Sequence, residues 1–179
     1  MSIIDSILNV FLGDKGKKDV KEVTPLVNSV IKFEDDLSKI SNDELRSITL
    51  EFKDEIKQLK DPFSIEIKDI NKIIEKSEDI DDNNASYKQI KKIQNQYLDK
   101  LDAYLNSILP KAFAVVKETT KRFKNNKEIS VKATPFDENL SSIKSYVKLN
   151  GNNAIWSNSW DAAGKSITWD MIHYDVQLI

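Results

Sequence analysis

Apolar residues recur every three or four positions along most of the first 125 residues, a spacing that places them on single faces of successive helices. The first predicted helix has a short apolar face that Gly13 can end, and a basic cluster follows it. Such a pairing is typical of a helix lying in the surface of an anionic bilayer. The alternative is a terminal helix that packs on the core. The face consists of Ile3, Ile4, Ile7, Leu8 and Phe11, and the cluster of Lys15, Lys17 and Lys18.

Two further helices have recognisable ends in the sequence. Thr24 and Pro25 predict the start of the second helix, with the threonine as cap and the proline at the first helical position. Ser41 and Glu44 form a capping box that predicts the start of the third. We expect the third helix to end at Asp61, because the residue before a proline avoids helical angles.

The helical pattern weakens in residues 64–80, and the acidic stretch 79–84 predicts a solvated loop. Asp81 and Asp82 do not indicate calcium, since no glycine and distal glutamate follow at the required spacing. The longest predicted helix spans residues 85–108. Its periodicity would suit a coiled coil, but the three tyrosines in its apolar stripe favour packing within a bundle. Pro110 predicts the start of one more, strongly apolar helix.

The character of the chain changes after residue 126. Residues 129–133 and 146–149 alternate between apolar and polar side chains, as strands with one buried face do. Asn150 and Gly151 are a strong signal for a tight hairpin turn, and residues 154–156 can return from it. The sequence therefore predicts a small antiparallel sheet over residues 128–157.

Composition narrows the possible functions. The chain has 179 residues and a net charge of −2, from 27 basic and 29 acidic side chains. This balance argues against general nucleic-acid binding, which needs an excess of positive charge. Cysteine is absent, and no run of 18 apolar residues could span a membrane. The N-terminus lacks the basic leader and small-residue cleavage site of a secretion signal.

One short stretch imitates a phosphate-binding loop. Gly164, Lys165 and Ser166 match the end of the Walker pattern, but Ser159 stands where its first glycine is required. No apolar strand precedes the stretch, and the residues after it start a helix poorly. We interpret the match as coincidental.

His173 is the single histidine, which excludes a metal site built on several histidines. A structural role, with a hydrogen bond to nearby backbone, is favoured over catalysis. Trp156, Trp160 and Trp169 are expected to pack the sheet against the helices rather than to form a ligand cage. No residue is predicted to be catalytic or to bind a metal.

Three segments resemble, in order, the SecA family of motor ATPases of bacterial preprotein export. Residues 40–53 resemble the family's Leu-Ser-Asp-Glu-Glu-Leu-Arg run, with Ile48 in place of the usual Lys. Residues 108–118 read Ile-Leu-Pro-Lys-Ala-Phe-Ala-Val-Val-Lys-Glu and resemble its Leu-Pro-Glu-Ala-Phe-Ala-Val-Val-Arg-Glu run, with Lys111 replacing Glu. Residues 171–178 resemble the segment that precedes the family's phosphate loop, with Ile172 replacing Arg.

The resemblance implies a fold class and a domain organisation. The fold would be mainly α with a small antiparallel β-sheet, and would form the helical N-terminal part of a RecA-like nucleotide-binding domain. The chain is expected to continue beyond its last, strand-like residues into the motor core. The expected parts are an amphipathic helix and basic linker in residues 1–18, a helical lead-in in 19–127, a small β insertion in 128–168 and an adenine-contacting motif in 169–179.

The resemblance also implies a site. Gln177 matches the family's adenine-reading glutamine, whose amide offers a donor and an acceptor side by side. Met171 and Tyr174 could add apolar contact to the base. The cofactor would be ATP, as Mg-ATP in the full-length protein. The phosphate loop and the Mg-binding acidic pair would follow this chain, so the chain alone is expected to hydrolyse no ATP.

The implied function is that of the SecA motor, which couples ATP hydrolysis to protein translocation through the SecYEG channel. The implied partners are SecYEG, unfolded preproteins, anionic phospholipids through residues between Ile3 and Lys18, and a second copy of the chain in a homodimer. The implied location is cytoplasmic and peripheral, at the inner face of the cytoplasmic membrane. Two alternatives remain open from the residues alone: a free-standing helical interaction or adaptor module without nucleotide binding, and a peripheral membrane protein that acts through its first 18 residues.

Overall fold

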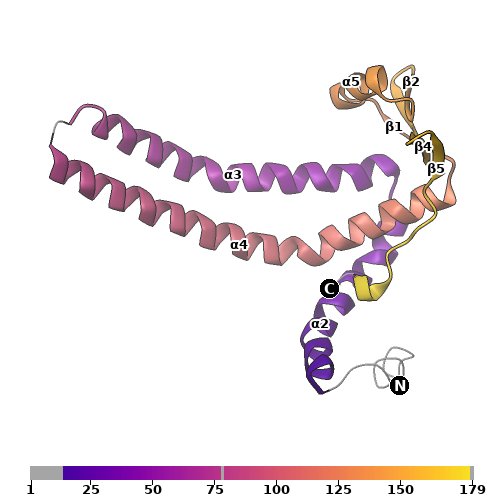
Figure 1. Cartoon of the computed structure of the whole chain (residues 1–179), viewed down its shortest axis with the longest axis horizontal. Coiled ribbons are helices and arrows are strands. Elements are labelled where there is room, and N and C mark those ends of the chain that lie inside the picture. The colour runs from indigo at the N-terminus through magenta and orange to yellow at the C-terminus, as the bar shows by residue number, and fades with distance from the viewer. Residues whose placement is uncertain (1–13, 78, 178–179) are drawn as a thin grey trace. The chain divides into compact units, whose positions relative to one another are not determined.

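A computed structural model describes residues 14–77 and 79–177 of the chain (Figure 1). Most of these residues are helical and a small part forms antiparallel β-structure, which confirms the predicted fold class. The described residues form two compact units. One contains the residues up to Leu45 and those from Pro110 onward, and the other contains residues 46–109. The predicted first helix of residues 3–11 lies outside the described residues.

Helix α2 spans Asp14–Lys39 and does not begin at the predicted cap. Thr24 and Pro25 lie inside the helix, so the predicted start is wrong. A proline in a helix removes one backbone hydrogen bond and crowds the preceding turn. Burial of Val27 and Val30 directly after it favours the continuous helix, because both side chains then reach the core of their unit.

Helix α3 spans Asn42–Ile74 and begins at the predicted capping box. The Glu44 amide donates to Ser41 Oγ at 3.2 Å, and the Ser41 amide donates to Glu44 Oε2 at 2.7 Å. These hydrogen bonds hold the pKa of Glu44 below its usual value. The predicted end at Asp61 is wrong, since α3 continues through Pro62 for three more turns.

Helix α4 spans Ile80–Asn125, so the break predicted at Pro110 is also absent. The predicted loop is shorter than expected because the helix begins within it. Asp79 explains this start, since its Oδ1 accepts hydrogen bonds from the amides of Asp81 at 2.8 Å and Asp82 at 3.3 Å. A side-chain oxygen before the first helical turn satisfies amides that have no partner in the helix.

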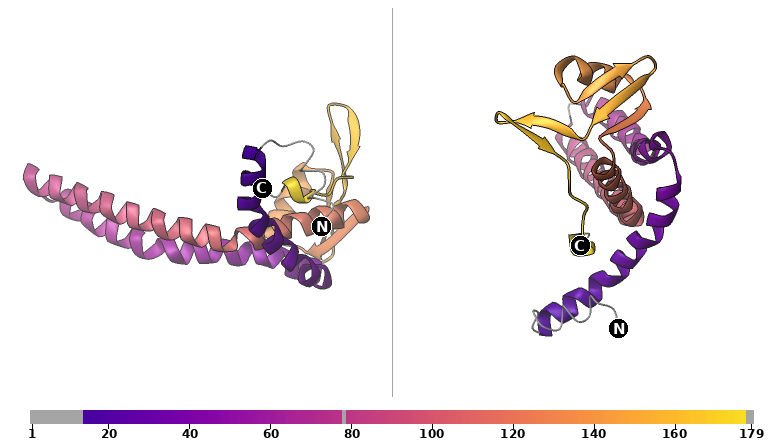
Figure 2. Two further views of the ribbon diagram at one scale, coloured as in Figure 1. Left: turned by 90° about the horizontal axis from the view of Figure 1, so that it is seen from below. Right: turned by 90° about the vertical axis from the view of Figure 1, so that its right-hand side faces the viewer.

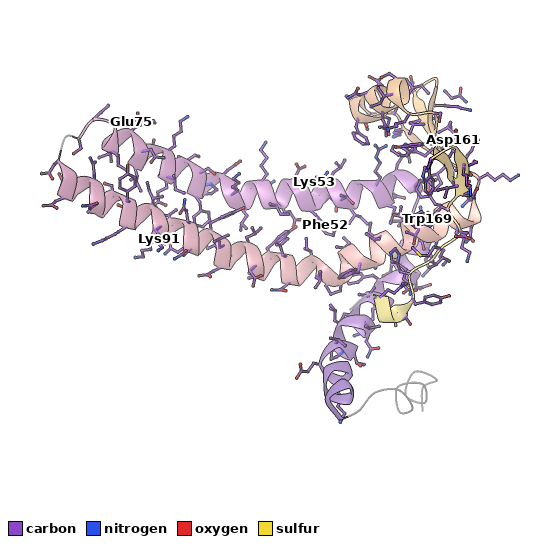
Figure 3. All side chains as sticks on the ribbon, in the orientation of Figure 1. Phe52, Lys53, Glu75, Lys91, Asp161 and Trp169 are labelled. Carbon is purple, nitrogen blue, oxygen red and sulfur yellow. The ribbon has the colours of Figure 1, made fainter. Side chains whose placement is uncertain are left out.

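Within the unit of residues 46–109, α3 and α4 run antiparallel and side by side (Figures 1 and 2). Phe52 points toward α4 whereas Lys53 points to solvent (Figure 3). The buried and half-buried positions recur at steps of three and four on both helices, which is the spacing of a coiled-coil seam. On α3 they are Phe52, Ile56, Leu59, Phe63, Ile67, Ile70 and Ile74, and on α4 Ile90, Ile93, Tyr97, Leu101, Tyr104 and Ile108.

The hairpin accommodates two of the three tyrosines of the predicted stripe, Tyr97 and Tyr104, whereas Tyr87 is exposed. The Tyr97 ring packs on Phe63 at a centroid distance of 5.7 Å, and the Lys100 ammonium lies 5.1 Å from the Phe63 ring centre. The Tyr104 hydroxyl donates to Glu55 Oε2 at 2.7 Å. Both tyrosine rings therefore contribute apolar surface to the seam, and the Tyr104 hydroxyl reaches an exposed carboxylate at its rim.

The environment of Tyr104 gives a test of this seam. Partial burial, together with the hydrogen bond to Glu55 and its charge, raises the pKa of Tyr104 to about 12. Because the folded pKa exceeds the ordinary value of about 10, the associated stabilisation is present below pH 10 and is lost as the pH rises toward 12. We expect Tyr104→Phe to remove the last tyrosinate transition in an absorbance titration. Glu55→Gln should move that transition to lower pH, and an unchanged titration in both variants would contradict the contact.

The unit that contains the residues up to Leu45 and those from Pro110 onward carries the β-structure. Strands β1 (Glu128–Lys132), β2 (Val147–Asn150) and β3 (Asn153–Ser157) form an antiparallel sheet in the order β1-β3-β2. The predicted sheet and its hairpin turn at Asn150-Gly151 are thus confirmed, and Gly151 adopts the positive φ of 57° that the turn requires. Its buried residues form one cluster, against which Phe123 and Trp156 pack: Ile129, Val131, Val147 and Ala154.

The start of α3 covers the free edge of β1. The amide of Lys132 donates to Asp43 Oδ1 at 2.8 Å, and Asn42 Nδ2 donates to the Ser130 carbonyl at 3.2 Å. These bonds occupy backbone groups of an edge strand that has no neighbouring strand on that side.

Helix α5 (Pro135–Ile143) lies between β1 and β2 and was not predicted. Its cap is Thr134, whose backbone amide and hydroxyl both donate to Asp137 Oδ2, at 2.9 and 2.7 Å. Asp137 is fully buried, and its Oδ1 accepts the indole N–H of Trp156 at 3.0 Å. One carboxylate therefore joins the start of α5 to the central strand.

Candidate functional site

Arg122 fixes the framework around the candidate site. Its Nε donates to Glu118 Oε1 at 2.8 Å, and its Nη2 donates to the carbonyls of Leu37 and Ile40, both at 2.8 Å. Its Nη1 donates to Asn42 Oδ1 at 2.9 Å. Only about a tenth of either charged side chain is exposed, 12% for Arg122 and 8% for Glu118. The guanidinium thereby joins the end of α2 and the start of α3 to the last turns of α4.

Lys117, one helical turn before this network, makes two ion pairs. Its Nζ lies 2.6 Å from Glu34 Oε1 on α2 and 2.8 Å from Asp175 Oδ1 near the end of the chain. The lysine side chain is only 14% exposed. Burial alone lowers the pKa of Lys117, but its hydrogen bonds to Asp175 and Glu34 and their charges outweigh that effect and raise it. The ammonium is therefore fully charged at neutral pH.

His173 gives the last segment a second contact with α4. Its Nδ1 lies 3.4 Å from Thr120 Oγ1, and that hydroxyl donates to the Lys117 carbonyl at 2.8 Å. The histidine is half-buried, in agreement with a structural role, but its described partner is a side-chain hydroxyl rather than the predicted backbone group. Together with Asp175 it holds the segment along α4.

Gln177 ends a short 3-10 turn, η1, that spans Asp175–Gln177. Its side chain is exposed, and its Oε1 accepts the Tyr174 amide at 2.9 Å. The Tyr174 carbonyl in turn accepts the Gln177 amide at 2.8 Å. The carboxamide is thus oriented by its own turn, and among the described residues nothing else occupies the second lone pair of Oε1 or the two amide N–H donors.

The two residues predicted to support base binding differ in position. Tyr174 belongs to the same turn as Gln177 and is 73% exposed, so its ring is available to a ligand. Met171 is 44% exposed and lies further back, where its carbonyl accepts the indole N–H of Trp169 at 2.7 Å. The structure therefore brings Tyr174 and Gln177 together.

The Walker-like stretch lies in a β-hairpin turn. Strands β4 (Ser159–Ala162) and β5 (Lys165–Thr168) pair antiparallel on either side of Ala163 and Gly164, whose φ angles are 49° and 75°. A phosphate loop instead leads from a strand into a helix, whose N-terminus holds the phosphate. This geometry agrees with the interpretation that the match is coincidental.

The three tryptophans do not share one role. Trp156 packs on the sheet cluster beside Phe123 of α4, as predicted. Trp160 and Trp169 instead contact each other across the β4–β5 hairpin, with ring centres 6.5 Å apart. Figure 3 shows Trp169 at the point where the chain leaves the hairpin. The three indoles line an open, largely apolar pocket of about 340 Å³ together with Phe123, Tyr146, Ser157 and Asn158.

Across residues 14–77 and 79–177, no group of three or more acidic or histidine side chains is arranged to hold a metal ion. None of the helices in the described ranges is long and apolar enough to cross a membrane.

Sequence reasoning missed Lys117, Glu34 and Asp175 as a cluster. Lys117 lies in one of the family-like segments, and Asp175 lies two residues before the predicted ligand residue. These two positions, within or beside family-like segments, were the signal in the sequence that could have indicated a role for both residues. The pairing itself joins residues that are 83 and 58 positions apart, and periodicity contains no information about such contacts.

Comparison with known proteins places the chain in a family. Residues 8–179 match the SecA DEAD-like domain. The protein translocase subunit SecA of Flavobacterium psychrophilum is 50% identical over the whole chain, and that of Christiangramia forsetii is 48% identical over the same length. The subunit from Bacteroides fragilis is 37% identical over 97% of the chain.

These relatives are much longer proteins, since the chain spans only 16% of the length of each. No solved structure matched the chain. The predicted resemblance is confirmed, as is the interpretation of the fold as part of a RecA-like nucleotide-binding domain. The chain belongs to the SecA DEAD-like domain family.

Proposed function

We propose that this chain forms the N-terminal part of a SecA-type motor that couples ATP hydrolysis to protein translocation through the SecYEG channel. The proposal is supported by the family match over residues 8–179 and by relatives named protein translocase subunit SecA. Unfolded preproteins are its transported substrates. The described part of the chain contributes structure and nucleotide contact rather than the chemical step.

The observation that carries the nucleotide role is the presentation of Gln177. Its exposed carboxamide is oriented by the Tyr174 amide, which occupies one lone pair of Oε1, and the amide N–H groups have no partner among the described residues. A glutamine amide pairs in bidentate fashion with the N6 and N7 atoms of adenine. Tyr174 can cover one side of the base. The phosphates and Mg²⁺ of Mg-ATP are bound by residues outside this chain, so the chain alone hydrolyses no ATP.

The proposal also assigns a location and partners. The motor acts from the cytoplasm as a peripheral protein at the inner face of the membrane. Residues between Ile3 and Lys18 contact anionic phospholipids and the channel, because they combine an apolar face with a basic cluster. The motor can act as a homodimer. It binds no nucleic acid, and the net charge of −2 supports this part of the proposal, because nucleic-acid binding needs an excess of positive charge.

Gln177→Ala in the full-length motor tests the adenine contact. We expect the affinity for ADP to fall by roughly 5- to 100-fold, since a bidentate amide–base pair contributes about 1–3 kcal/mol of discrimination. GDP affinity should change little, because guanine offers acceptors at both O6 and N7. Both dissociation constants can be measured by calorimetric titration of the nucleotide-free protein.

Gln89→Ala is the matched control, since Gln89 is an exposed glutamine on α4 in the other unit. It should leave both affinities unchanged. An ADP-to-GDP preference that survives Gln177→Ala would contradict the adenine contact. If the full-length motor binds neither nucleotide, the adaptor alternative replaces the proposal.

A further inference from the structure

Three segments that are distant in sequence meet at one ammonium group. Lys117 on α4 contacts Glu34 on α2 at 2.6 Å and Asp175 on η1 at 2.8 Å. About a third of each carboxylate side chain is exposed, 35% for Glu34 and 36% for Asp175. The lysine side chain itself is mostly shielded from solvent. An ion pair with a shielded partner is screened less by salt than an exposed pair.

Asp175 connects this cluster to the proposed adenine-binding residue, Gln177. It is the first residue of the turn that Gln177 ends, so the cluster holds the start of the turn against two helices. The end of the turn is held only by its own hydrogen bonds with Tyr174, as far as the described contacts show. The orientation of the carboxamide relative to the helices therefore depends on the contact at Asp175.

We propose that Lys117 is a positioning residue for adenine recognition: its ammonium, shared with Glu34, fixes Asp175 and thereby orients the turn that presents Gln177 to the base. This inference rests on the proposed function, because it assigns a role in the same nucleotide site. Lys117 itself does not touch the nucleotide.

The physical reason is that one positive charge balances two carboxylates. Removing the ammonium leaves Glu34 and Asp175 facing each other, so their repulsion drives the turn away from α2. The His173–Thr120 contact still tethers the segment upstream, so the chain remains folded while the turn loses its fixed orientation. Binding then requires the turn to be ordered again at a cost in free energy.

Lys117→Met in the full-length motor tests the inference. We expect the ADP affinity to fall by about tenfold, a typical effect of uncoupling a support from a binding group. The affinity for inorganic tripolyphosphate should stay unchanged, since that ligand has no adenine. Lys117→Arg, which keeps the charge, should restore most of the ADP affinity. Lys124→Met, a change at an exposed lysine on the same helix, should alter neither affinity.

A second variant guards against a simple folding defect. Asp175→Asn removes the charge at the turn but leaves Lys117 paired with Glu34. It should weaken ADP binding to the same degree and leave the thermal unfolding midpoint unchanged. When Gln177→Ala is already present, Lys117→Met should add little further loss, because the group that it positions is gone.

The outcomes separate the two proposals. Unchanged ADP affinity in Lys117→Met, alongside a clear loss in Gln177→Ala, would overturn the positioning role and leave the adenine contact intact. An equal loss for ADP and tripolyphosphate would overturn it as well, since that result indicates general disruption. No loss in Gln177→Ala would overturn the adenine contact and this inference with it.

Discussion

Replacing Arg122 with methionine is expected to lower the free energy of unfolding by about 3–5 kcal/mol, the range found when one partner of a buried ion pair is removed. Methionine preserves much of the apolar stem but none of the four hydrogen bonds. Glu118, 8% exposed, then keeps a charge without its main partner. The carbonyls of Leu37 and Ile40 lose the donor that satisfies the end of α2.

The measurement is urea unfolding followed by tryptophan fluorescence. All three tryptophans lie beyond Pro110, so the signal reports on the unit that contains Arg122. Lys121→Met is the matched control, because Lys121 is half-exposed and lies 3.8 Å from the same carboxylate. It should change stability by no more than about 0.5 kcal/mol. Equal effects of the two substitutions would show that the Arg122 network does not stabilise this unit.

Asp137→Ala is expected to cost about 3–4 kcal/mol of unfolding free energy, because it removes the acceptor of three partly buried donors, at about 1 kcal/mol or more each. The donors are the backbone amide and hydroxyl of Thr134 and the indole N–H of Trp156. The carboxylate itself is fully buried, so its removal also leaves a cavity at the start of α5.

Tryptophan fluorescence again gives a direct readout, since Trp156 is one of the affected donors. Asp137→Asn should have an intermediate effect, because its side-chain oxygen can accept only part of these bonds. Glu138→Ala changes an exposed carboxylate in the same first turn and should cost about 0.5 kcal/mol or less. A cost of that size for Asp137→Ala would contradict the joining role assigned to this side chain.

Sequence patterns predicted the elements better than their ends. The capping box at Ser41 and the turn at Asn150-Gly151 were confirmed because each depends on residues within four positions of one another. The breaks expected at Pro25, Asp61 and Pro110 were wrong. A proline weakens a helix locally, but burial of an apolar face on both sides of it depends on packing partners that are distant in sequence.

The site was predictable only in part, for the same reason. A family-like segment pointed to Gln177, and the structure shows its carboxamide exposed in a turn. The two ion pairs of Lys117 join residues that are distant in sequence, since Glu34 lies near the start of the chain and Asp175 near its end. We predicted no helix around Asp137, although Thr134 and Asp137 form a capping box with Pro135 at the first helical position.

The covered edge of β1 affects the tendency of the protein to aggregate at high concentration. Exposed sheet edges recruit strands from other molecules, which leads to aggregation. Asp43 and Asn42 already occupy backbone groups of β1, so strand addition to this three-stranded sheet is left with its other edge, β2. Strand β2 is four residues long and carries Lys148, two features that discourage such pairing. The start of a helix thus protects a small sheet from polymerisation.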